Sequence, residues 1–224
     1  MLSDSVSRRR LMKFCVLGSA LGALSPSAFS AQTLPLVSAK KVLVIYFSMS
    51  ETDQASNMTQ EEDNSTVVID GQVLGNTQYL AQLIATETKG EIYRISPLKP
   101  YPKDHKTLVD LAKNEQDANA RPVIAGTLPA FDQYDTIFLG YPNWWGDFPM
   151  IMYSFLEQVD LSGKTVVPFN THGGSGFSDT IETIIEKQPK AQVIKEGLTI
   201  SRSRMQTAPQ RVKQWLSSLG SKTM

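Results

Sequence analysis

Short apolar runs alternate with longer amphipathic segments along most of this chain, and this alternation constrains its fold most strongly. The apolar runs are rich in β-branched residues and occupy residues 41–48, 91–96, 136–141, 165–170 and 192–200. Segments with helical spacing occupy residues 75–89, 106–119, 149–159, 178–187 and 208–219. Because parallel strands are joined by crossover helices, the pattern predicts an α/β protein with a doubly wound, five-stranded parallel sheet between two helix layers.

Three of the apolar runs carry further information about their places in the sheet. The run at residues 41–48 is continuously apolar, which is typical of a strand buried on both faces and predicts the first and central strand. The run at 91–96 alternates between apolar and polar residues and predicts a half-buried strand. We expect the last strand, at 192–200, to be broken near Gly197.

Residues 1–30 have the composition of an export signal. A basic stretch at residues 7–13 precedes an apolar run of 11 residues and then a stretch of small residues. This run is too short to span a bilayer, which takes about 20 residues, so no stable membrane anchor is expected after cleavage. The paired arginines resemble a twin-arginine signal, and an ordinary secretory signal is the alternative. We expect a periplasmic or otherwise exported bacterial protein that uses the twin-arginine export machinery.

Charge and cysteine content exclude several classes of function. The chain has 22 basic and 22 acidic side chains, and cleavage after residue 30 removes four basic residues and one acidic residue, which leaves a net charge of −3. Without a basic field, nucleic acid is not an expected partner. The single cysteine, Cys15, and the two histidines are too few for thiolate clusters or zinc hydrolases. A mature chain without cysteine suits an oxidising compartment.

A polar stretch at about residues 51–74 interrupts the alternation between the first strand and its helix. It contains an Asp-Gly pair, Asp70-Gly71, flanked by apolar residues on both sides. This pair is a strong local signal for a β-hairpin and predicts a small two-stranded flap. A disordered insertion is the alternative, and neither interpretation disturbs the core.

The first candidate ligand loop follows the first strand, because open α/β sheets bind ligands beyond the carboxyl ends of their strands. Ser48 and Ser50 end this strand, and after the insertion Asn76, Thr77 and Gln78 open a helix. Hydroxyls, an amide and free helix N–H groups can bind a phosphate without a basic residue. Capping of the helix by Asn76 or Thr77 is the alternative. The loop lacks the glycine patterns of dinucleotide and nucleoside-triphosphate sites.

The second candidate loop follows the third strand and contains two adjacent tryptophans. Its central residues are Pro142, Asn143, Trp144, Trp145 and Gly146. This spacing does not bury both indoles in the core, so we expect at least one on the surface or against a flat ligand. The alternative for the other tryptophan is packing beneath its own loop.

The third candidate loop follows the fourth strand and consists of Thr171, His172, Gly173, Gly174 and Ser175. Glycines allow backbone N–H groups to approach a ligand edge closely, and a plain flexible loop is the alternative. His172 could offset negative charge on a bound ligand or could make a hydrogen bond that organises the loop. His105 and the acidic residues of the insertion are interpreted as solvated.

A phosphate loop, an aromatic platform and a backbone-rich edge together describe a site for flavin mononucleotide (FMN). From residue 41 to 219 the chain resembles the flavodoxin family, specifically members with a Tyr-Pro-x-Trp-Trp-Gly loop, here Tyr141 to Gly146. The resemblance implies strand order 2-1-3-4-5, non-covalent FMN and redox chemistry at the flavin. It divides the chain into an export signal at 1–30, a linker at 31–39 and one flavodoxin-like domain at 40–220 with its insertion at 51–74.

The resemblance also assigns the site residues by position. The phosphate is expected at Ser48, Ser50, Asn76, Thr77 and Gln78. One side of the ring is expected at Pro142, Asn143, Trp144, Trp145 and Gly146. The polar edge of the ring is expected at Thr171, His172, Gly173, Gly174 and Ser175. The expected partners are a redox protein or a small acceptor such as a quinone.

Other functions account for fewer of these features. A receiver domain needs acidic residues where Ser48 and Tyr141 stand, and a serine hydrolase needs a further glycine where Phe177 stands. A cofactor-free interaction module and an NAD(P)H-dependent quinone reductase remain as alternatives. The sequence offers no dinucleotide loop, and Arg202 and Arg204, after the last strand, are interpreted as solvated charges.

Overall fold

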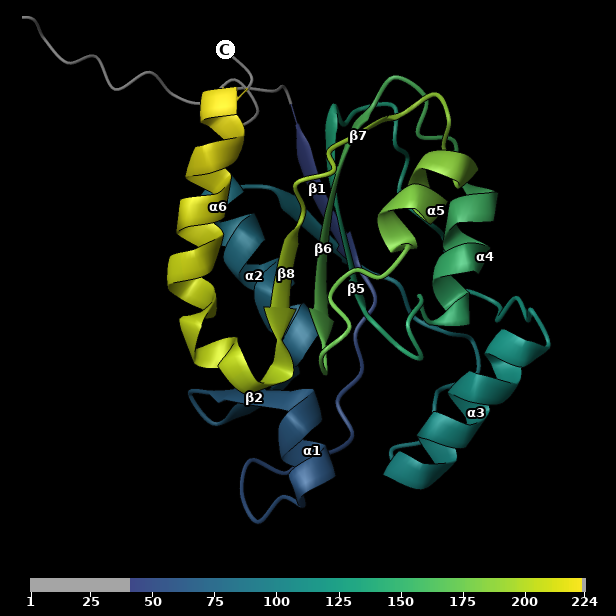
Figure 1. Cartoon of the computed structure of the whole chain (residues 1–224), viewed down its shortest axis with the longest axis vertical. Helices are drawn as coiled ribbons and strands as arrows, with labels where there is room; N and C mark the ends of the chain where they lie inside the picture. The colour runs from purple at the N-terminus through teal and green to yellow at the C-terminus, as the bar shows by residue number, and fades with distance from the viewer. Residues whose placement is uncertain (1–40, 223–224) are drawn as a thin grey trace, which may run out of the picture. The chain divides into compact units, whose positions relative to one another are not determined.

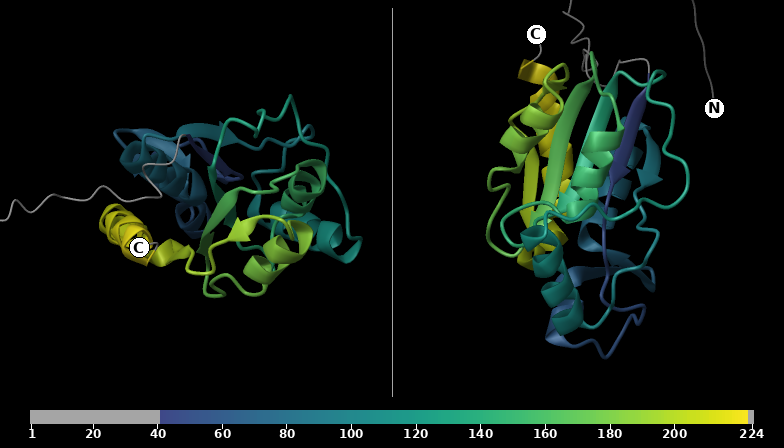
Figure 2. Two further views of the ribbon diagram at one scale, coloured as in Figure 1. Left: turned by 90° about the horizontal axis from the view of Figure 1, so that it is seen from above. Right: turned by 90° about the vertical axis from the view of Figure 1, so that its right-hand side faces the viewer.

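The computed structural model describes residues 41–222, which form a parallel sheet with helices on both faces (Figure 1). The expected export signal at 1–30 and linker at 31–39 lie outside these residues. No helix within the described range is long and apolar enough to cross a membrane. Figure 2 shows the two helix layers from two further directions.

All pairings in the sheet are parallel, as predicted. The strands are β1 (Val42–Tyr46), β4 (Glu91–Arg94), β5 (Thr136–Pro142), β6 (Thr165–His172), β7 (Gln192–Val193) and β8 (Leu198–Ser201). They lie in the order β4-β1-β5-β6-β7, and β8 also pairs with β6. This arrangement is the predicted order 2-1-3-4-5, in which β7 and β8 together occupy the fifth position.

The fifth strand is divided because its middle passes close to a neighbouring loop. β7 pairs with the first half of β6 and β8 with the second half. A Cβ atom at Gly197 would lie 2.6 Å from both the Phe177 ring and the Pro168 carbonyl oxygen. The predicted break near Gly197 therefore lies where the chain has no room for a side chain.

Two apolar clusters hold the helices to the sheet. On one face, Val42, Val44 and Tyr46 of β1 pack with the helices α2 (Asn76–Thr88) and α6 (Ala208–Lys222). On the other face, Leu43 and Ile45 belong to the cluster beneath α3, α4 and α5. These helices span His105–Asp117, Met150–Gln158 and Thr180–Lys187. The continuous apolar run of β1 thus supplies both cores, as expected of a strand buried on both faces.

The predicted half-buried strand at 91–96 is more exposed than its alternation indicates. In β4, Glu91, Ile92 and Arg94 are exposed and Tyr93 is intermediate. β4 is an edge strand that pairs with β1 alone, so fewer neighbours cover it. The first residue that the run buries completely is Ile95, just beyond the strand.

The insertion forms regular structure. β2 (Thr66–Ile69) and β3 (Gln72–Gly75) make the predicted hairpin, and positive φ angles at Asp70 and Gly71 form its turn. A short helix, α1 (Gln60–Ser65), precedes it and was not predicted from the sequence. Its signal was present, because Thr59 and Glu62 have the spacing of a capping box and make both of its hydrogen bonds.

Candidate functional site

A cavity of about 110 Å³ opens at the carboxyl ends of β1, β5 and β6, where the sequence placed the ligand loops. Residues from all three loops line it, together with residues of the insertion and of the segment after β8. The lining residues are Met49, Glu51, Asn64, Ser65, Asn76, Thr77, Leu108, Pro142, Asn143, Trp144, Thr171, His172, Gly173 and Arg202. The topology thus brings residues more than 100 positions apart to one edge of the sheet.

A second compartment of about 190 Å³ adjoins the first. The two share the lining residues Glu51, Leu108, Asn143, Trp144 and Arg202. Val109 and Ala112 of α3 and the side chains of His105 and Trp145 complete the second compartment. Pockets for small ligands commonly enclose about 300–1,000 Å³, and the two compartments together reach the lower end of that range. We call the pair the rim groove.

The first turn of α2 is held by the strand before the insertion. Gly75 is the N-cap of α2 and makes no side-chain cap, but the Ser48 hydroxyl accepts a hydrogen bond of 3.1 Å from the Gln78 backbone N–H. A Cβ atom at Gly75 would lie 2.3 Å from the Ser48 Oγ atom. Neither Asn76 nor Thr77 caps the helix. The alternative weighed from the sequence, a simple cap by Asn76 or Thr77, is therefore wrong, because Ser48 fills that role.

The remaining phosphate candidates have different surroundings. The Thr77 and Thr171 hydroxyls are buried and lie 2.8 Å apart, so they join the start of α2 to the end of β6. The Asn76 side-chain amide donates to the Asn64 carbonyl oxygen, while its own buried Oδ1 atom has no partner. Ser50 and Gln78 line neither compartment of the rim groove.

The tryptophan loop makes a tight turn whose backbone is strained. Trp144 and Asp147 pair across it through two backbone hydrogen bonds of 2.9 and 3.0 Å. Between them, Trp145 and Gly146 have φ angles of 55° and 78°. A left-handed conformation is unfavourable for a bulky side chain and persists where surrounding contacts enforce it, often at functional sites.

The two indoles have separate environments. The Trp144 ring meets the rings of Phe47 and Tyr101 edge to face, at centroid distances of 5.6 and 5.5 Å, and lines both compartments. Trp145 is 54% exposed, and its ring N–H donates to the Val109 carbonyl oxygen of α3 over 3.2 Å. Trp144 is therefore anchored to the core, while Trp145 presents an immobilised face to the second compartment.

The third loop contributes its first half to the rim groove. Thr171, His172 and Gly173 line it, whereas Gly174, Ser175 and also Gly146 of the second loop do not. The Asn143 amide donates to the Gly176 carbonyl oxygen and to the Ser178 hydroxyl, each over 3.1 Å. These bonds tie the second and third loops together, so the two sides of the groove are positioned as one unit.

The environment of His172 opposes a positive charge on its ring. Burial and, to a smaller extent, the charge of Arg211 lower the pKa of His172. The uncharged imidazole therefore prevails at neutral pH. Its buried Nδ1 atom has no hydrogen-bond partner. This environment disfavours charge compensation, and the Nδ1 atom makes no hydrogen bond that would organise the loop.

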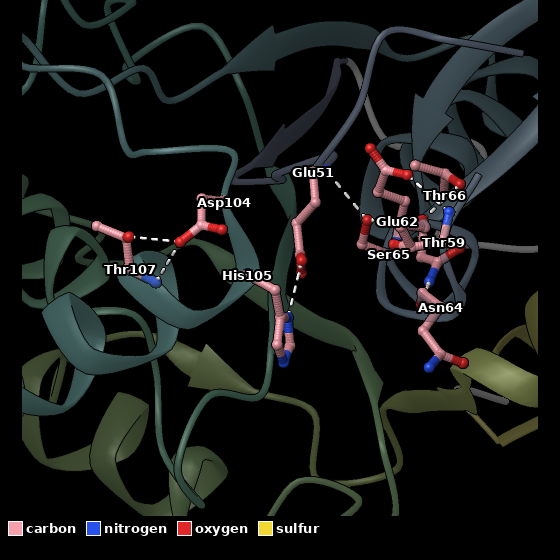
Figure 3. Close-up of polar contacts among 10 residues, drawn as sticks. Glu51, Thr59, Glu62, Asn64, Ser65, Thr66, Asp104, His105 and Thr107 are labelled. Carbon is pink, nitrogen blue, oxygen red and sulfur yellow. Dashed lines mark hydrogen bonds and ion pairs between the residues drawn. The ribbon is translucent and has the colours of Figure 1, made fainter. Parts of the chain in front are cut away.

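Three titratable or charged residues of the rim groove, Glu51, His105 and Arg202, were not predicted as site residues. The Glu51 carboxylate lies 2.8 Å from the His105 ring Nδ1 atom, which joins the start of the insertion to the start of α3 (Figure 3). The Glu51 side chain is only 10% exposed, and burial raises its pKa above the usual range despite the hydrogen bond from His105. Arg202 is the third residue. The sequence positions of Glu51 and Arg202 could have indicated them, because each follows the carboxyl end of a strand.

The residues of the rim groove fit a flavin nucleotide. Its lining contains the N-terminus of α2, which favours an anion, and an aromatic face at Trp145. Asn76 Oδ1 and His172 Nδ1 are buried polar atoms without partners, which a ligand rich in hydroxyl and ring hydrogen-bonding groups would satisfy. No cluster of His, Cys, Asp or Glu within residues 41–222 could hold a metal ion.

The family model described as Flavodoxin matches residues 65–219. This chain belongs to the flavodoxin family. The match begins at the last residue of α1 and so covers the hairpin, α2 and every later element. No curated protein matches the chain.

Solved structures agree with the family assignment. A protein from Bacteroides uniformis assigned as a flavoprotein is 28% identical, with a TM-score of 0.59, over 78% of this chain and 99% of its own. A similarly assigned protein from Bacteroides eggerthii is 26% identical, with a TM-score of 0.59, over 80% and 97%. A flavoprotein from Lactobacillus acidophilus, solved in complex with FMN, shares the fold at 20% identity and a TM-score of 0.55, over 80% and 99%.

Proposed function

We propose that this flavodoxin-family chain binds FMN non-covalently in the rim groove and works as an electron-transfer protein of the cell envelope. The observation that carries the proposal is the pair of buried, unpartnered atoms, Asn76 Oδ1 and His172 Nδ1, in a groove at the carboxyl edge of the sheet. Leaving such atoms without partners costs about 1–3 kcal/mol each, so the groove favours a ligand that pairs them. The FMN in the Lactobacillus acidophilus flavoprotein supports the choice of ligand.

Within this proposal, each loop has a distinct task. The start of α2, with Asn76 and Thr77, receives the phosphate end, and Ser48 keeps the helix start in position. Trp145 offers its face to the ring, and the backbone of Gly173 forms part of the opposite wall. His172, being uncharged, exchanges a hydrogen bond with the ligand through Nδ1. Bound FMN would supply one- or two-electron redox chemistry.

The place of action follows from the N-terminal sequence. FMN is large and charged and is made in the cytoplasm, so the groove is best filled before export. The twin-arginine route moves folded proteins and meets this requirement. Replacing both Arg8 and Arg9 by Lys should trap flavin-loaded precursor inside the cell, whereas normal export of this variant would contradict the route.

The electron donor follows from the compartment. Soluble NAD(P)H is confined to the cytoplasm, so an exported flavoprotein takes electrons from a protein or a quinol at the membrane. We expect slow reduction of the mature holoprotein by NADH or NADPH and faster reduction by a one-electron donor protein or a low-potential dye. A small acceptor such as a quinone, or a second redox protein, then accepts the electrons.

Anaerobic stopped-flow absorbance of the flavin-loaded mature chain tests this function. Saturable bleaching by a one-electron donor at a rate well above that with NADPH supports electron transfer. Rapid, saturable bleaching by NADPH would instead favour an NAD(P)H-dependent quinone reductase. A purified chain that binds no flavin at all would favour the cofactor-free interaction module.

A further inference from the structure

Arg202, which the sequence suggested to be a solvated charge, lines the rim groove. It is the first residue of the short 3₁₀ helix η1 (Arg202–Thr207), directly after β8. Its side chain lines both compartments. A Cβ atom at Gly173 would lie 3.4 Å from the guanidinium carbon, an ordinary van der Waals distance, so the guanidinium lies directly against the third loop.

The guanidinium is the groove's available positive charge. His105, the other basic residue of the second compartment, is paired with Glu51, and His172 is uncharged at neutral pH. In the part of the chain that the structure describes, no carboxylate lies within 4.0 Å of Arg202. Arg202 therefore has its planar set of donors free for a ligand anion, and its charge acts on the nearby Glu51 carboxylate without a salt bridge.

The phosphate end of the groove needs such a charge. Asn76 and Thr77, the residues of α2 that line this end of the groove, have no basic side chain. The Glu51 carboxylate lines the same compartment as Asn76 and Thr77, and it would repel a bound phosphate. A guanidinium in that compartment offsets this repulsion and adds charge-assisted hydrogen bonds.

We propose that Arg202 binds the phosphate of the flavin nucleotide and makes the groove select FMN over riboflavin. This inference rests on the proposed FMN binding. Arg202 directly follows β8 and adds a positive charge to the expected phosphate site. The residues expected there from the sequence offer only hydroxyls, amides and helix N–H groups. The charge of Arg202 also explains how the groove accepts a dianion beside Glu51.

Titration of the apo protein with FMN and with riboflavin, followed by quenching of flavin fluorescence, tests the role of Arg202. Arg202→Gln should weaken FMN binding about tenfold or more, as expected for lost charge-assisted bonds, and leave riboflavin binding within about twofold. Arg202→Lys should recover part of the FMN affinity, because it keeps the charge without the fork. The matched control is Arg204→Gln, which removes a neighbouring exposed arginine that lines neither compartment.

Competition and salt provide a second readout. Inorganic phosphate should compete with FMN for the parent protein and much less for Arg202→Gln, and added salt should weaken FMN binding more in the parent. Equal losses for FMN and riboflavin would place Arg202 at the ring and overturn the inference, as would an unchanged FMN affinity. A parent protein that binds riboflavin and FMN equally also overturns it, whereas a parent that binds neither removes the proposed function itself.

Discussion

Two regions of the chain line the rim groove, the loops after β5 and β6 and the inserted segment at 51–74, and different contacts hold each of them in place. The loops after β5 and β6 continue fully buried strands and are locked by backbone register and by the Asn143 bonds between them. The inserted segment at 51–74 contributes Glu51, Asn64 and Ser65, yet its helix α1 buries no residue. Polar contacts tie it to the groove, namely the hydrogen bond between Glu51 and His105, the Asp53–Lys103 ion pair and the bond from Asn76 to Asn64. Val67 and Leu74 of its hairpin pack against the core.

This difference indicates how the two sources should respond to mutation. A buried, close-packed region loses much stability when its shape changes, because neighbouring atoms cannot move away. An exposed ion pair such as Asp53–Lys103 contributes little to stability, so the exposed part of the insertion can be altered at small cost to the fold. Substitutions in the loops after β5 and β6 should therefore change both the free energy of unfolding and the affinity for FMN. Substitutions in the insertion should change the affinity for FMN with little effect on the free energy of unfolding.

The largest contrast is expected between a glycine of the sheet and a glycine of the insertion. A Cβ atom at Gly140 in β5 would lie 2.1 Å from the buried Phe169 ring, so Gly140→Ala should lower the free energy of unfolding by about 2–3 kcal/mol. Gly71→Ala in the hairpin turn meets no neighbour and strains only a φ of 77°, for a loss of about 1 kcal/mol. Urea unfolding of both variants gives the comparison.

Adding Phe169→Leu to Gly140→Ala serves as the control for this contrast. The smaller side chain makes room for the new methyl group, so part of the lost stability should return. Equal losses for Gly140→Ala and Gly71→Ala would show that the sheet and the insertion tolerate change alike, against the comparison drawn above.

The two adjacent tryptophans of the loop after β5 should differ in their effects on folding stability and on FMN affinity. Trp144→Ala removes edge contacts with Phe47 and Tyr101 and should cost about 2 kcal/mol or more of folding stability. Trp145→Ala removes an exposed face held on α3 and should weaken FMN binding by about 1 kcal/mol while stability changes little. Thermal unfolding and FMN titration separate the two effects. If both variants bind FMN as tightly as the parent, the platform assignment is wrong.

The hydroxyl pair at the start of α2 gives a smaller effect. Thr77→Val leaves the buried Thr171 hydroxyl without its partner and should cost about 1 kcal/mol of stability, and it should weaken FMN binding more than riboflavin binding. Adding Thr171→Val removes the unpaired hydroxyl and should restore stability but not FMN affinity. Thr86→Val on the exposed side of α2 is the control, because its hydroxyl bonds only to the Gln82 carbonyl oxygen and lines neither compartment. Similar losses for both flavins would limit Thr77 to a structural role.

The smallest expected effect is a pair of opposite pH dependences. The pKa of His172 is lowered by burial, so its contribution to stability is present above pH 6.5 and is lost as the pH falls further. The pKa of Glu51 is raised by burial, so its contribution is present below pH 4.5 and is lost as the pH rises through its folded pKa. Glu51 also faces Glu61 and Arg202 as well as His105.

Single substitutions separate these two groups. His172→Asn should make stability less sensitive to acid between pH 7 and 5. Glu51→Gln should gain stability relative to the parent as the pH rises above 4.5, because the parent must then bury a carboxylate. Unfolding curves from pH 4 to 8 measure both trends, and the same sign of change in the two variants would refute this assignment.

Features with a local cause were predictable from the sequence. Burial of β1 on both faces, the Asp70-Gly71 turn and the loops at the carboxyl edge all follow from patterns within a few residues. The middle position of the sheet belongs to β5 rather than to the predicted β1. The exposure of β4 was not predicted, because it depends on the strand's edge position in the assembled sheet. Helix α1 also has a local signal, the capping box formed by Thr59 and Glu62, although it was not predicted.

Parts of the site that depend on distant contacts were not predictable. The hydroxyl contact of Thr77 with Thr171 joins residues 94 positions apart, and the hydrogen bond between Glu51 and His105 joins residues 54 apart. Nothing in either local sequence indicates its partner. The hydrogen bond from the Gln78 N–H to the Ser48 hydroxyl likewise joins residues 30 positions apart, on the two sides of the insertion.

Titration of the purified mature chain with FMN, monitored by flavin fluorescence and absorbance, tests the central claim most directly. The account predicts saturation at one FMN per chain, tighter binding of FMN than of riboflavin, and a flavin spectrum perturbed by the nearby indole. Trp145→Ala and Arg202→Gln should each weaken the binding. An intact, folded chain that quenches neither flavin would contradict the assignment of the rim groove as an FMN site.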